Sequence, residues 1–231
     1  MKIQFIGTGG AFDYKNGNSS ALILWKGKHI LIDCGHSVYP KLMALGIAEK
    51  IDYVLITHLH DDHAGSFSTL LYYHYFFKNQ KLTVLCPNEK AKKLWIEYLA
   101  FPMQTPEQFA HFELFSNLEG LQFIDTYGFH SPDMQTYAYI FTDETETLIY
   151  SGDLGDCDFL FQQLNTMNIK PQRIFHDIIF HPNIPPHSYY QKVMPYLADN
   201  KIFGYHCNHL ENPADNTIPL VGNMPDLLLN A

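Results

Sequence analysis

The sequence predicts an α/β protein in which two β-sheets pack face to face and helices cover both outer surfaces, a four-layer αβ/βα sandwich. Two observations support this prediction. Each half of the chain begins with closely spaced strand patterns and then alternates strands with helices. Short apolar runs also end directly at histidines and aspartates, which places the polar chemistry at strand ends.

In the first half, apolar runs are separated by polar or glycine-containing turns. Strands are expected at residues 3–6, 21–25, 30–33, 53–57 and 82–86. The run 53–57 is continuously apolar, as in a buried strand, and it ends at a histidine cluster. Helices are expected at 38–45, 65–77 and 88–99, the last with Asn88 as its N-cap.

The second half repeats this organisation. Strands are expected at 121–126, 137–142, 147–151, 173–178 and 202–205. Helices are expected at 159–164 and at 188–197, the latter interrupted near Pro195. Because no linker or low-complexity tract divides the chain, we expect residues 1–231 to form a single domain.

Composition limits the function classes. Apolar residues make up 46% and charged residues 17%, an ordinary balance for a soluble enzyme. The net charge is -9 and the 15 Lys and Arg residues are thinly spread, which counts against a long nucleic acid as partner. Because no apolar run has secretory or membrane length, we expect a cytoplasmic protein with reduced cysteines and no membrane partner.

The strongest functional pattern is Thr57-His58-Leu59-His60-Asp61-Asp62-His63, directly after a predicted buried strand. Three imidazoles and two carboxylates so close together are costly to bury without a cation. In a turn that leaves a strand, His58 and His60 can point the same way while Asp62 and His63 curl toward a second position. The spacing therefore favours two neighbouring metals over one closed structural site. The alternative is a solvated loop that happens to be rich in histidine.

Four further segments each place an acidic or histidine residue at a strand end: Asp33 in Leu-Ile-Asp-Cys-Gly, His130 in Gly-Phe-His-Ser, Asp153 in Tyr-Ser-Gly-Asp and His206 in Gly-Tyr-His. Together with the histidine cluster, these segments resemble the five motifs of the metallo-β-lactamase superfamily. Their order and strand-end placement agree with that family along nearly the whole chain. The resemblance implies a metal-dependent hydrolase.

The resemblance also implies a ligand set. One metal would be held by His58, His60, His130 and Asp153. The other would be held by Asp62, His63, His206 and the bridging Asp153, while Asp33 would orient the metal-binding loop. Nitrogen and carboxylate donors of this kind suit two Zn²⁺ ions best, with Mn²⁺ or Fe as alternatives. Cys207 and His209 are not expected to be ligands, because the neighbouring His206 already fits.

Three segments resemble the phosphodiesterase branch of the superfamily, which includes RNase Z, cyclic-phosphate phosphodiesterases and phage anti-Pycsar cyclic-nucleotide phosphodiesterases. They are the opening Ile3-Gln4-Phe5-Ile6-Gly7-Thr8-Gly9-Gly10-Ala11-Phe12, Phe175-His176-Asp177 and His187-Ser188. The branch's His-Glu motif has Asp177 in the place of Glu here. The resemblance implies that His176 and His187 hold phosphate oxygens or protonate the leaving oxygen, with His181 as a competitor. Asp62 would orient the attacking water.

The substrate is therefore predicted to be a small phosphodiester, with a cyclic nucleotide favoured. Bacterial tRNA 3′-processing relatives carry a long arm between the third and fourth motifs, and the segment from His130 to Asp153 has room only for two strands and a turn. A lactonase or a glyoxalase II-like thioesterase would share all five motifs, and a non-catalytic binding module is a third class. Relatives in this branch are commonly dimers, so a homodimer is expected.

Overall fold

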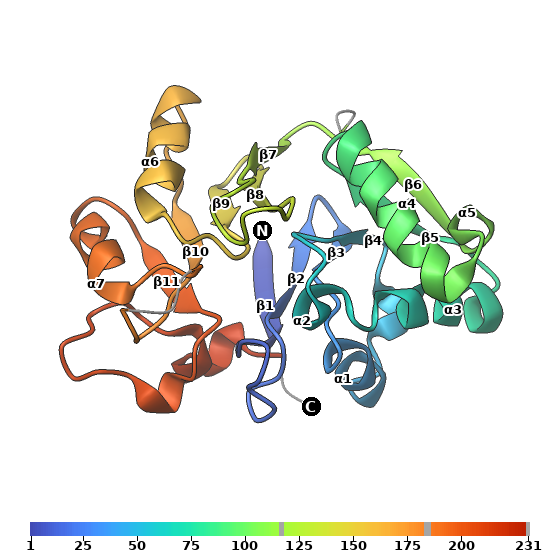
Figure 1. Ribbon diagram of the computed structural model, residues 1–231, viewed down its shortest axis with the longest axis horizontal. Helices are drawn as coiled ribbons and strands as arrows, with labels where there is room; N and C mark the ends of the chain where they lie inside the picture. Colours follow the sequence, from blue (N-terminus) through green and yellow to red (C-terminus); the bar gives the residue numbers. More distant parts are fainter. Residues whose placement is uncertain (116–117, 183–185, 230–231) are drawn as a thin grey trace.

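The structure, a computed structural model, describes residues 1–115, 118–182 and 186–229. It contains two mixed β-sheets with helices on the side of each sheet that faces away from the other (Figure 1). The predicted α/β sandwich is therefore confirmed.

The first sheet has the strand order β1-β2-β3-β4-β5-β6. Its strands are β1 (Lys2–Gly7), β2 (Ser20–Trp25), β3 (Lys28–Ile32), β4 (Tyr53–Leu55), β5 (Leu82–Cys86) and β6 (Ala110–Leu114). Neighbours are antiparallel from β1 to β3 and parallel from β3 to β6. The accompanying helices are α1 (Val38–Ala44), α2 (Asp61–Ala64), α3 (Phe67–Lys78), α4 (Glu89–Met103) and α5 (Pro106–Phe109).

The second sheet has the strand order β11-β10-β9-β8-β7. Its strands are β7 (Leu121–Asp125), β8 (Tyr137–Thr142), β9 (Thr147–Tyr150), β10 (Arg173–Asp177) and β11 (Ile202–Tyr205). Neighbours are again antiparallel first, from β7 to β9, and then parallel to β11. The helices are α6 (Cys157–Thr166) and α7 (Tyr190–Val193), followed by a 3₁₀ helix at Met194–Ala198. The two halves thus repeat one pattern.

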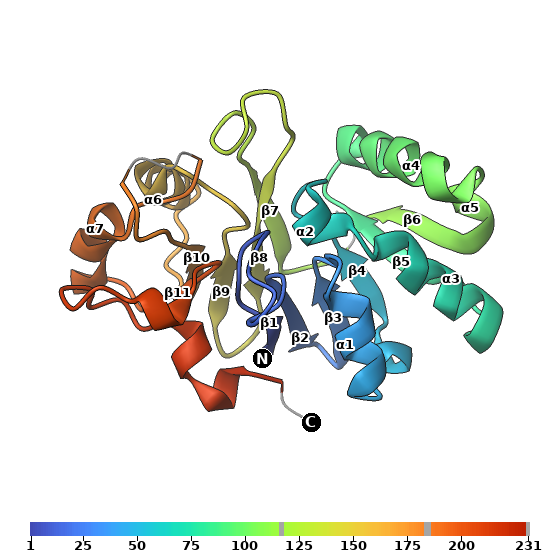
Figure 2. The ribbon, with the colours of Figure 1, turned by 60° about the horizontal axis from the view of Figure 1, so that its bottom comes forward.

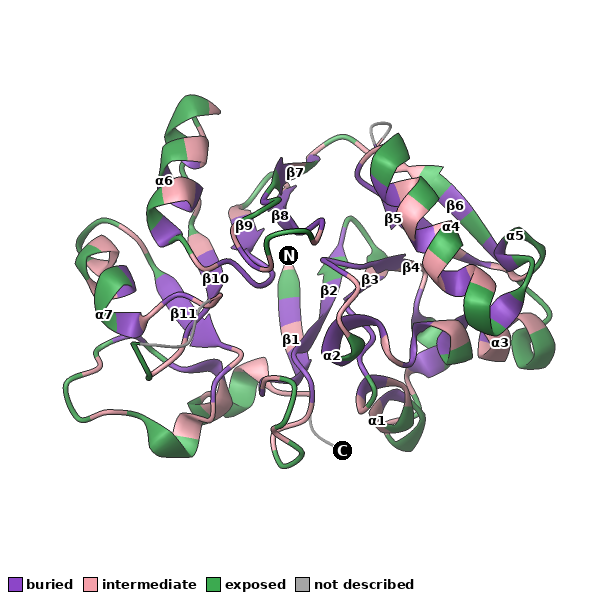
Figure 3. Cartoon of the chain, viewed as in Figure 1, coloured by how far each residue is buried: buried purple, intermediate pink, exposed green. Residues whose placement is uncertain are grey.

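Aromatic side chains join the two sheets. Phe5 of β1 is fully buried, and its ring centre lies 5.3 Å from that of Phe175 on β10 and 5.6 Å from that of Tyr205 on β11. Figure 3 shows the strands largely buried, whereas the long helices have one buried and one exposed face. This rigid interior, shielded from water, holds the strand ends in fixed relative positions.

The elements differ from the sequence predictions in a few places. Neither β6 nor α5 was predicted. The helix expected at 65–77 begins at Phe67, because residues 61–64 form the separate helix α2. The interruption expected near Pro195 is present as the change from α7 to a 3₁₀ helix. The N-cap expected at Asn88 is also present: its side chain accepts a hydrogen bond from the Ala91 amide at the start of α4.

Candidate metal centre and active site

The site lies at one edge of the paired sheets, where several strands end (Figure 2). His58 follows β4, Asp153 follows β9 and His206 follows β11, while His130 lies between β7 and β8. The ends of parallel strands meet at one edge of a sheet, which is why residues distant in sequence converge. Three groups of donor atoms could each hold a metal ion, with the atoms of each group within 4.8 Å of one another. The first cluster is His58, His60 and His130, and the second is Asp62, His63, Asp153 and His206. The third group, His130, Asp153 and His187, overlaps with both clusters.

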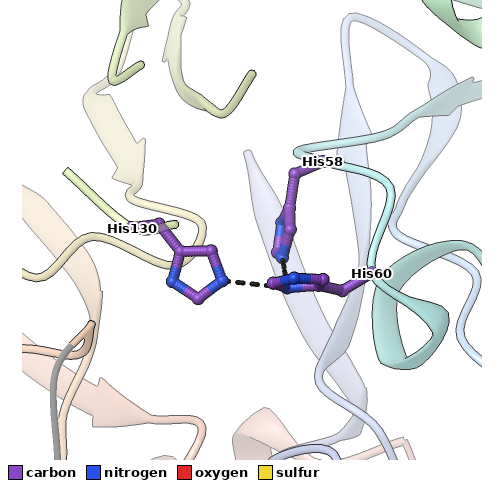
Figure 4. Close-up of side chains that lie close together, drawn as sticks. All are labelled: His58, His60 and His130. Atoms are coloured by element: carbon purple, nitrogen blue, oxygen red, sulfur yellow. Dashed lines mark hydrogen bonds between the residues drawn. The ribbon is translucent and has the colours of Figure 1, made fainter. Parts of the chain in front are cut away.

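The first cluster consists of three imidazoles. His60 Nδ1 lies 3.0 Å from His58 Nε2 and 2.9 Å from His130 Nε2. Figure 4 shows the rings of these three residues pointing toward one another from different directions. Donor atoms about 2.0 Å from a tetrahedral Zn²⁺ lie about 3.3 Å apart. The spacing is therefore close to that of ligands around one metal ion.

The second cluster mixes imidazoles and carboxylates. His63 Nε2 and His206 Nε2 each lie 3.3 Å from Asp62 Oδ2 and 3.3 Å from Asp153 Oδ2. Among the described residues, the buried atoms His63 Nε2 and Asp153 Oδ1 have no hydrogen-bond partner. Buried polar atoms without partners are costly, and a divalent cation would satisfy them. The donor set therefore fits a metal.

Asp153 belongs to the second cluster and lies beside the first. Besides its contacts in the second cluster, its Oδ2 lies 3.8 Å from His58 Nε2 and 3.8 Å from His130 Nε2. The carboxylate is only 2% exposed. One buried carboxylate between two donor clusters is the arrangement that a bridging ligand requires.

Asp33 holds the loop that carries most of these ligands. Its Oδ1 accepts a hydrogen bond of 2.7 Å from the Thr57 amide, and its Oδ2 lies 2.8 Å from His63 Nδ1. The second contact occupies Nδ1 and leaves His63 Nε2 as the donor atom for a metal. Asp33 and His206 have φ values of 63° and 64°, a left-handed conformation that is strained for residues with a side chain. The surrounding packing maintains that strain at the site.

The electrostatics of the two clusters differ. Burial and the neighbouring His63 hold the pKa of His58 well below its ordinary value, and burial also lowers the pKa values of His60 and His130. Neutral imidazoles are the form that binds metals. Burial lowers the pKa of His63 as well, but Asp153 and Asp33 outweigh burial and raise that pKa well above its ordinary value. The second cluster thus has an excess of carboxylate charge that a divalent cation would neutralise.

Of the outer residues, His187 faces the site. It lines the cleft, its Nδ1 lies 2.9 Å from Asp177 Oδ2, and its ring stacks on His206 at 4.7 Å. Burial lowers the pKa of His187, but the hydrogen bond to Asp177 and the charge of Asp153 raise it to about 9. A histidine protonated at neutral pH beside the metal ligands has the properties of a general acid.

His176 lies elsewhere. It is 1% exposed, does not line the cleft, and places its Nε2 3.0 Å from Ser188 Oγ. His181, its competitor in the sequence analysis, does line the cleft. The structure therefore brings His187 to the metal ligands and leaves His176 behind the cleft wall.

The cleft over the two clusters has a volume of about 1250 Å³. One part of its wall is the loop from Gly10 to Lys15, in which Phe12 is 98% and Tyr14 86% exposed. Phe12 ends the opening segment that resembles the phosphodiesterase branch, but neither Phe12 nor Tyr14 was predicted to line the site, although two aromatic residues in a polar loop are a visible signal. Among the described residues that line the cleft, Lys15 is the only Lys or Arg, beside several acids. Apart from Lys15 and protonated His187, a bound phosphate would therefore depend on metal ions for positive charge.

Cys207 and His209 belong to neither donor cluster, as expected. Cys207 lines the cleft, and burial raises the pKa of its thiol to about 12. All four cysteines are free and buried. Within the described ranges, every helix is too short or too polar to cross a bilayer.

The fold is that of known metallo-β-lactamase-fold proteins. YhfI from Bacillus subtilis matches with a TM-score of 0.69 and 19% identity, over 93% of this chain and 88% of that one. The short form of human tRNase Z matches with a TM-score of 0.65 and 18% identity, over 92% and 95%. A diphosphatase of the PhnP family matches with a TM-score of 0.64 and 19% identity, over 94% and 93%. These likenesses show the metallo-β-lactamase fold, and the donor clusters fit divalent metal ions.

Sequence comparison identifies a more specific family than the fold does. The family described as anti-Pycsar protein Apyc1 matches residues 1–219. The Apyc1 protein of Bacillus phage vB_BsuM-Goe3 is 30% identical over 231 residues, which cover 89% of this chain and 88% of the relative. That of Bacillus phage 010DV004 is 39% identical over 111 residues, only 47% of this chain and 43% of the relative. The chain belongs to the anti-Pycsar protein Apyc1 family.

Proposed function

We propose that the chain is a two-metal phosphodiesterase that hydrolyses a cyclic nucleotide. The observation that carries this proposal is the pair of donor clusters that share Asp153 at the base of one cleft. Membership of the anti-Pycsar family supports the substrate class, because anti-Pycsar proteins degrade cyclic nucleotides.

The proposed ligands follow the two clusters. His58, His60, His130 and Asp153 hold one ion, and Asp62, His63, His206 and Asp153 hold the other. Imidazole and carboxylate donors favour Zn²⁺, with Mn²⁺ as the alternative. When bound, the ions supply positive charge for phosphate oxygens and lower the pKa of a coordinated water.

The protein's own groups then orient the reactants and move protons. Burial raises the pKa of Asp62, but the neighbouring imidazoles of His206 and His63 outweigh burial and hold that pKa below its ordinary range. Asp62 is therefore ionised at neutral pH and can accept a hydrogen bond from the attacking water. His187 donates a proton to the leaving oxygen through Nε2, because Asp177 occupies its Nδ1.

A small substrate suits the cleft better than a long nucleic acid. The segment between His130 and Asp153 consists of β8, β9 and their connecting loops, with no extended arm to hold tRNA. The net charge of -9 and the acidic cleft wall also oppose a polyanion. The exposed Phe12 and Tyr14 give the cleft aromatic surface of the kind on which a nucleobase stacks.

The proposal includes a cytoplasmic homodimer. Phe76, Phe77 and Phe101, on α3 and α4, are 63%, 78% and 92% exposed and are candidates for the surface that a second copy covers. Light scattering on the purified chain measures the mass directly. A mass of two chains is expected, and a monomer at micromolar concentration would contradict the dimer.

The catalytic test is hydrolysis of bis-p-nitrophenyl phosphate and of a panel of 3′,5′- and 2′,3′-cyclic nucleotides with Zn²⁺ or Mn²⁺. We expect metal-dependent turnover of a cyclic nucleotide that His60→Ala abolishes. His111→Ala is the matched control, because His111 is an exposed histidine on the edge strand β6. Its turnover should equal that of the wild type.

Other outcomes would contradict the proposal and select an alternative. Opening of a lactone or thioester with every phosphodiester untouched would indicate a lactonase or a glyoxalase II-like thioesterase. Cleavage of a tRNA precursor with no turnover of cyclic nucleotides would indicate 3′-processing. Nucleotide binding by metal-free protein without turnover would indicate a binding module.

A further inference from the structure

A group of buried hydrogen bonds lies behind the cleft-facing His187. His176 and Ser188 are each 1% exposed, and neither lines the cleft. His176 Nε2 lies 3.0 Å from Ser188 Oγ. The machinery proposed above gives no role to this pair, although Ser188 is the residue that follows His187.

The direction of these hydrogen bonds can be assigned from the serine. The Ser188 hydroxyl donates to the carbonyl oxygen of Leu154 at 2.7 Å, so its oxygen is left to accept from His176. His176 therefore carries its proton on Nε2. Burial lowers the pKa of His176, which is consistent with a neutral ring that donates one hydrogen bond.

Leu154 connects this pair to His187 by a second route. The Leu154 amide donates to Asp177 Oδ1 at 2.9 Å, and Asp177 Oδ2 lies 2.9 Å from His187 Nδ1. The N–H and the C=O of Leu154 are thus held by Asp177 and Ser188. Because Leu154 directly follows Asp153, the same contacts tie His187 to the carboxylate shared by the two donor clusters.

We infer that His176 and Ser188 are positioning residues that fix the orientation of His187 toward the leaving oxygen and do not themselves contact the substrate. The inference rests on the proposed function, because it takes His187 as the general acid. A donor must be held within hydrogen-bond reach of the atom that it protonates, and small misplacements are costly. The His176–Ser188 contact holds the backbone beside His187, and Asp177 holds its ring.

The dependence of kcat/KM on the leaving group distinguishes a loss of His187 positioning from a general loss of folded or active protein. The metal-loaded protein is assayed on methyl aryl phosphodiesters whose leaving groups range from p-nitrophenol to phenol. A good leaving group departs without a proton, whereas a poor one needs the acid. Ser188→Ala and His176→Leu should each lower kcat/KM for the phenyl ester about tenfold more than for the p-nitrophenyl ester. This ratio does not depend on the fraction of folded protein.

Two further variants serve as a rescue and as a control. His176→Gln keeps an N–H close to the position of Nε2 and should restore the ratio to within about threefold of the wild type. Ser20→Ala removes an equally buried hydroxyl, which contacts the carbonyl oxygens of Ile32 and Asp33 in the first half of the chain, away from His187. It should cost stability but leave the ratio of the two esters unchanged.

The outcomes that would overturn the inference are distinct. Equal losses on all esters in Ser188→Ala and His176→Leu would make the pair purely structural. Equal impairment of His176→Gln and His176→Leu would indicate that the imidazole itself acts on the substrate. His187→Ala should show the steepest leaving-group dependence. If kcat/KM of His187→Ala falls equally on all esters, both the role of His187 as general acid and its positioning by His176 and Ser188 are contradicted. If His187→Ala shows a steep leaving-group dependence but Ser188→Ala does not, only the positioning role is contradicted.

Discussion

The two halves of the molecule contribute to the site in different ways. The first half supplies His58, His60, Asp62 and His63 from one short segment after β4. The second half supplies single residues from separate places, such as Asp153 after β9 and His206 after β11. A contiguous segment can be recognised from spacing alone, whereas isolated residues acquire meaning only when the sheet brings their strand ends together.

The halves also differ in how the ligands are held. In the first half, the buried carboxylate of Asp33 fixes both the backbone at Thr57 and the ring of His63. In the second half, Asp177 fixes His187 and the amide after Asp153. Each half thus has a carboxylate that orients functional groups, and Asp153 joins the two arrangements.

The largest effect is expected for Asp153→Ala, because this change removes the carboxylate that both clusters share. Phosphodiesterase activity should fall by about 10⁴-fold or more, as when one member of an interdependent catalytic unit is removed. Steady-state kinetics with saturating metal measure the loss. Asp199→Ala, an exposed carboxylate outside the cleft, is the control. A loss of less than about tenfold would contradict the bridging role.

A smaller effect is expected for Asp33→Asn, which changes the carboxylate that orients the first half. Mutation of such supporting residues costs about 10- to 100-fold in metal affinity or activity. Competition with a chromophoric chelator measures the affinity. If the affinity for both ions is unchanged in Asp33→Asn, the orienting role of Asp33 in the first half is wrong.

Metal removal tests whether the centre also holds the halves together. Ligand binding to the folded state adds about 2.7 kcal/mol when the free metal exceeds its dissociation constant 100-fold. Thermal unfolding with and without chelator should therefore show a lower melting temperature for the metal-free wild type. The shift should be much smaller in Asp153→Ala. Equal shifts in both proteins would place the stabilising metal elsewhere.

The smallest effect is expected at a contact of the second half that lies away from the cleft. Arg173 of β10 donates two hydrogen bonds to Glu146, at 2.8 Å and 2.6 Å. Arg173→Gln should lower the free energy of unfolding by about 1 kcal/mol without changing activity, as for partly exposed ion pairs. Chemical denaturation at pH 7 measures this difference. A loss of activity with unchanged stability would contradict a purely structural role.

The pH dependence of that difference has a definite sign. Burial raises the pKa of Glu146, but the hydrogen bond and charge of Arg173 outweigh burial and lower that pKa below its ordinary value. The contribution is therefore complete above the ordinary glutamate pKa of about 4.3 and is lost as the pH falls through the lowered value. The wild type and Arg173→Gln should converge in stability in acid. A difference that persists at low pH would contradict the ion pair.

Much of the fold was predictable because its strands are short apolar runs with clear ends. The strand β6 was not predicted, although Ala110, Phe112 and Leu114 alternate with the polar His111 and Glu113. The signal was present but short, and β6 directly follows helix α5. Helix α2 was not predicted, because a single helical turn at Asp61–Ala64 is too short to give a periodic apolar pattern.

The donor clusters were predictable, but the roles of the outer histidines were not. Sequence alone placed His176 and His187 together over the metals. Adjacent residues on a strand point to opposite faces, so Asp177 reaches His187 while His176 turns toward Ser188. Which of the two faces of β10 borders the cleft depends on how the sheets pack. The hydrogen bonds made by the Leu154 backbone carry no side-chain pattern and cannot be found in a sequence.

The central claim is that two halves of one chain hold two ions through a shared carboxylate. The most direct measurement is the metal content of the zinc-saturated protein by mass spectrometry, together with cyclic-nucleotide turnover as metal is titrated in. We expect two ions per chain in the wild type and turnover that appears only as the second ion binds. Full turnover with one ion per chain, or binding of fewer than two ions at saturation, would contradict the account.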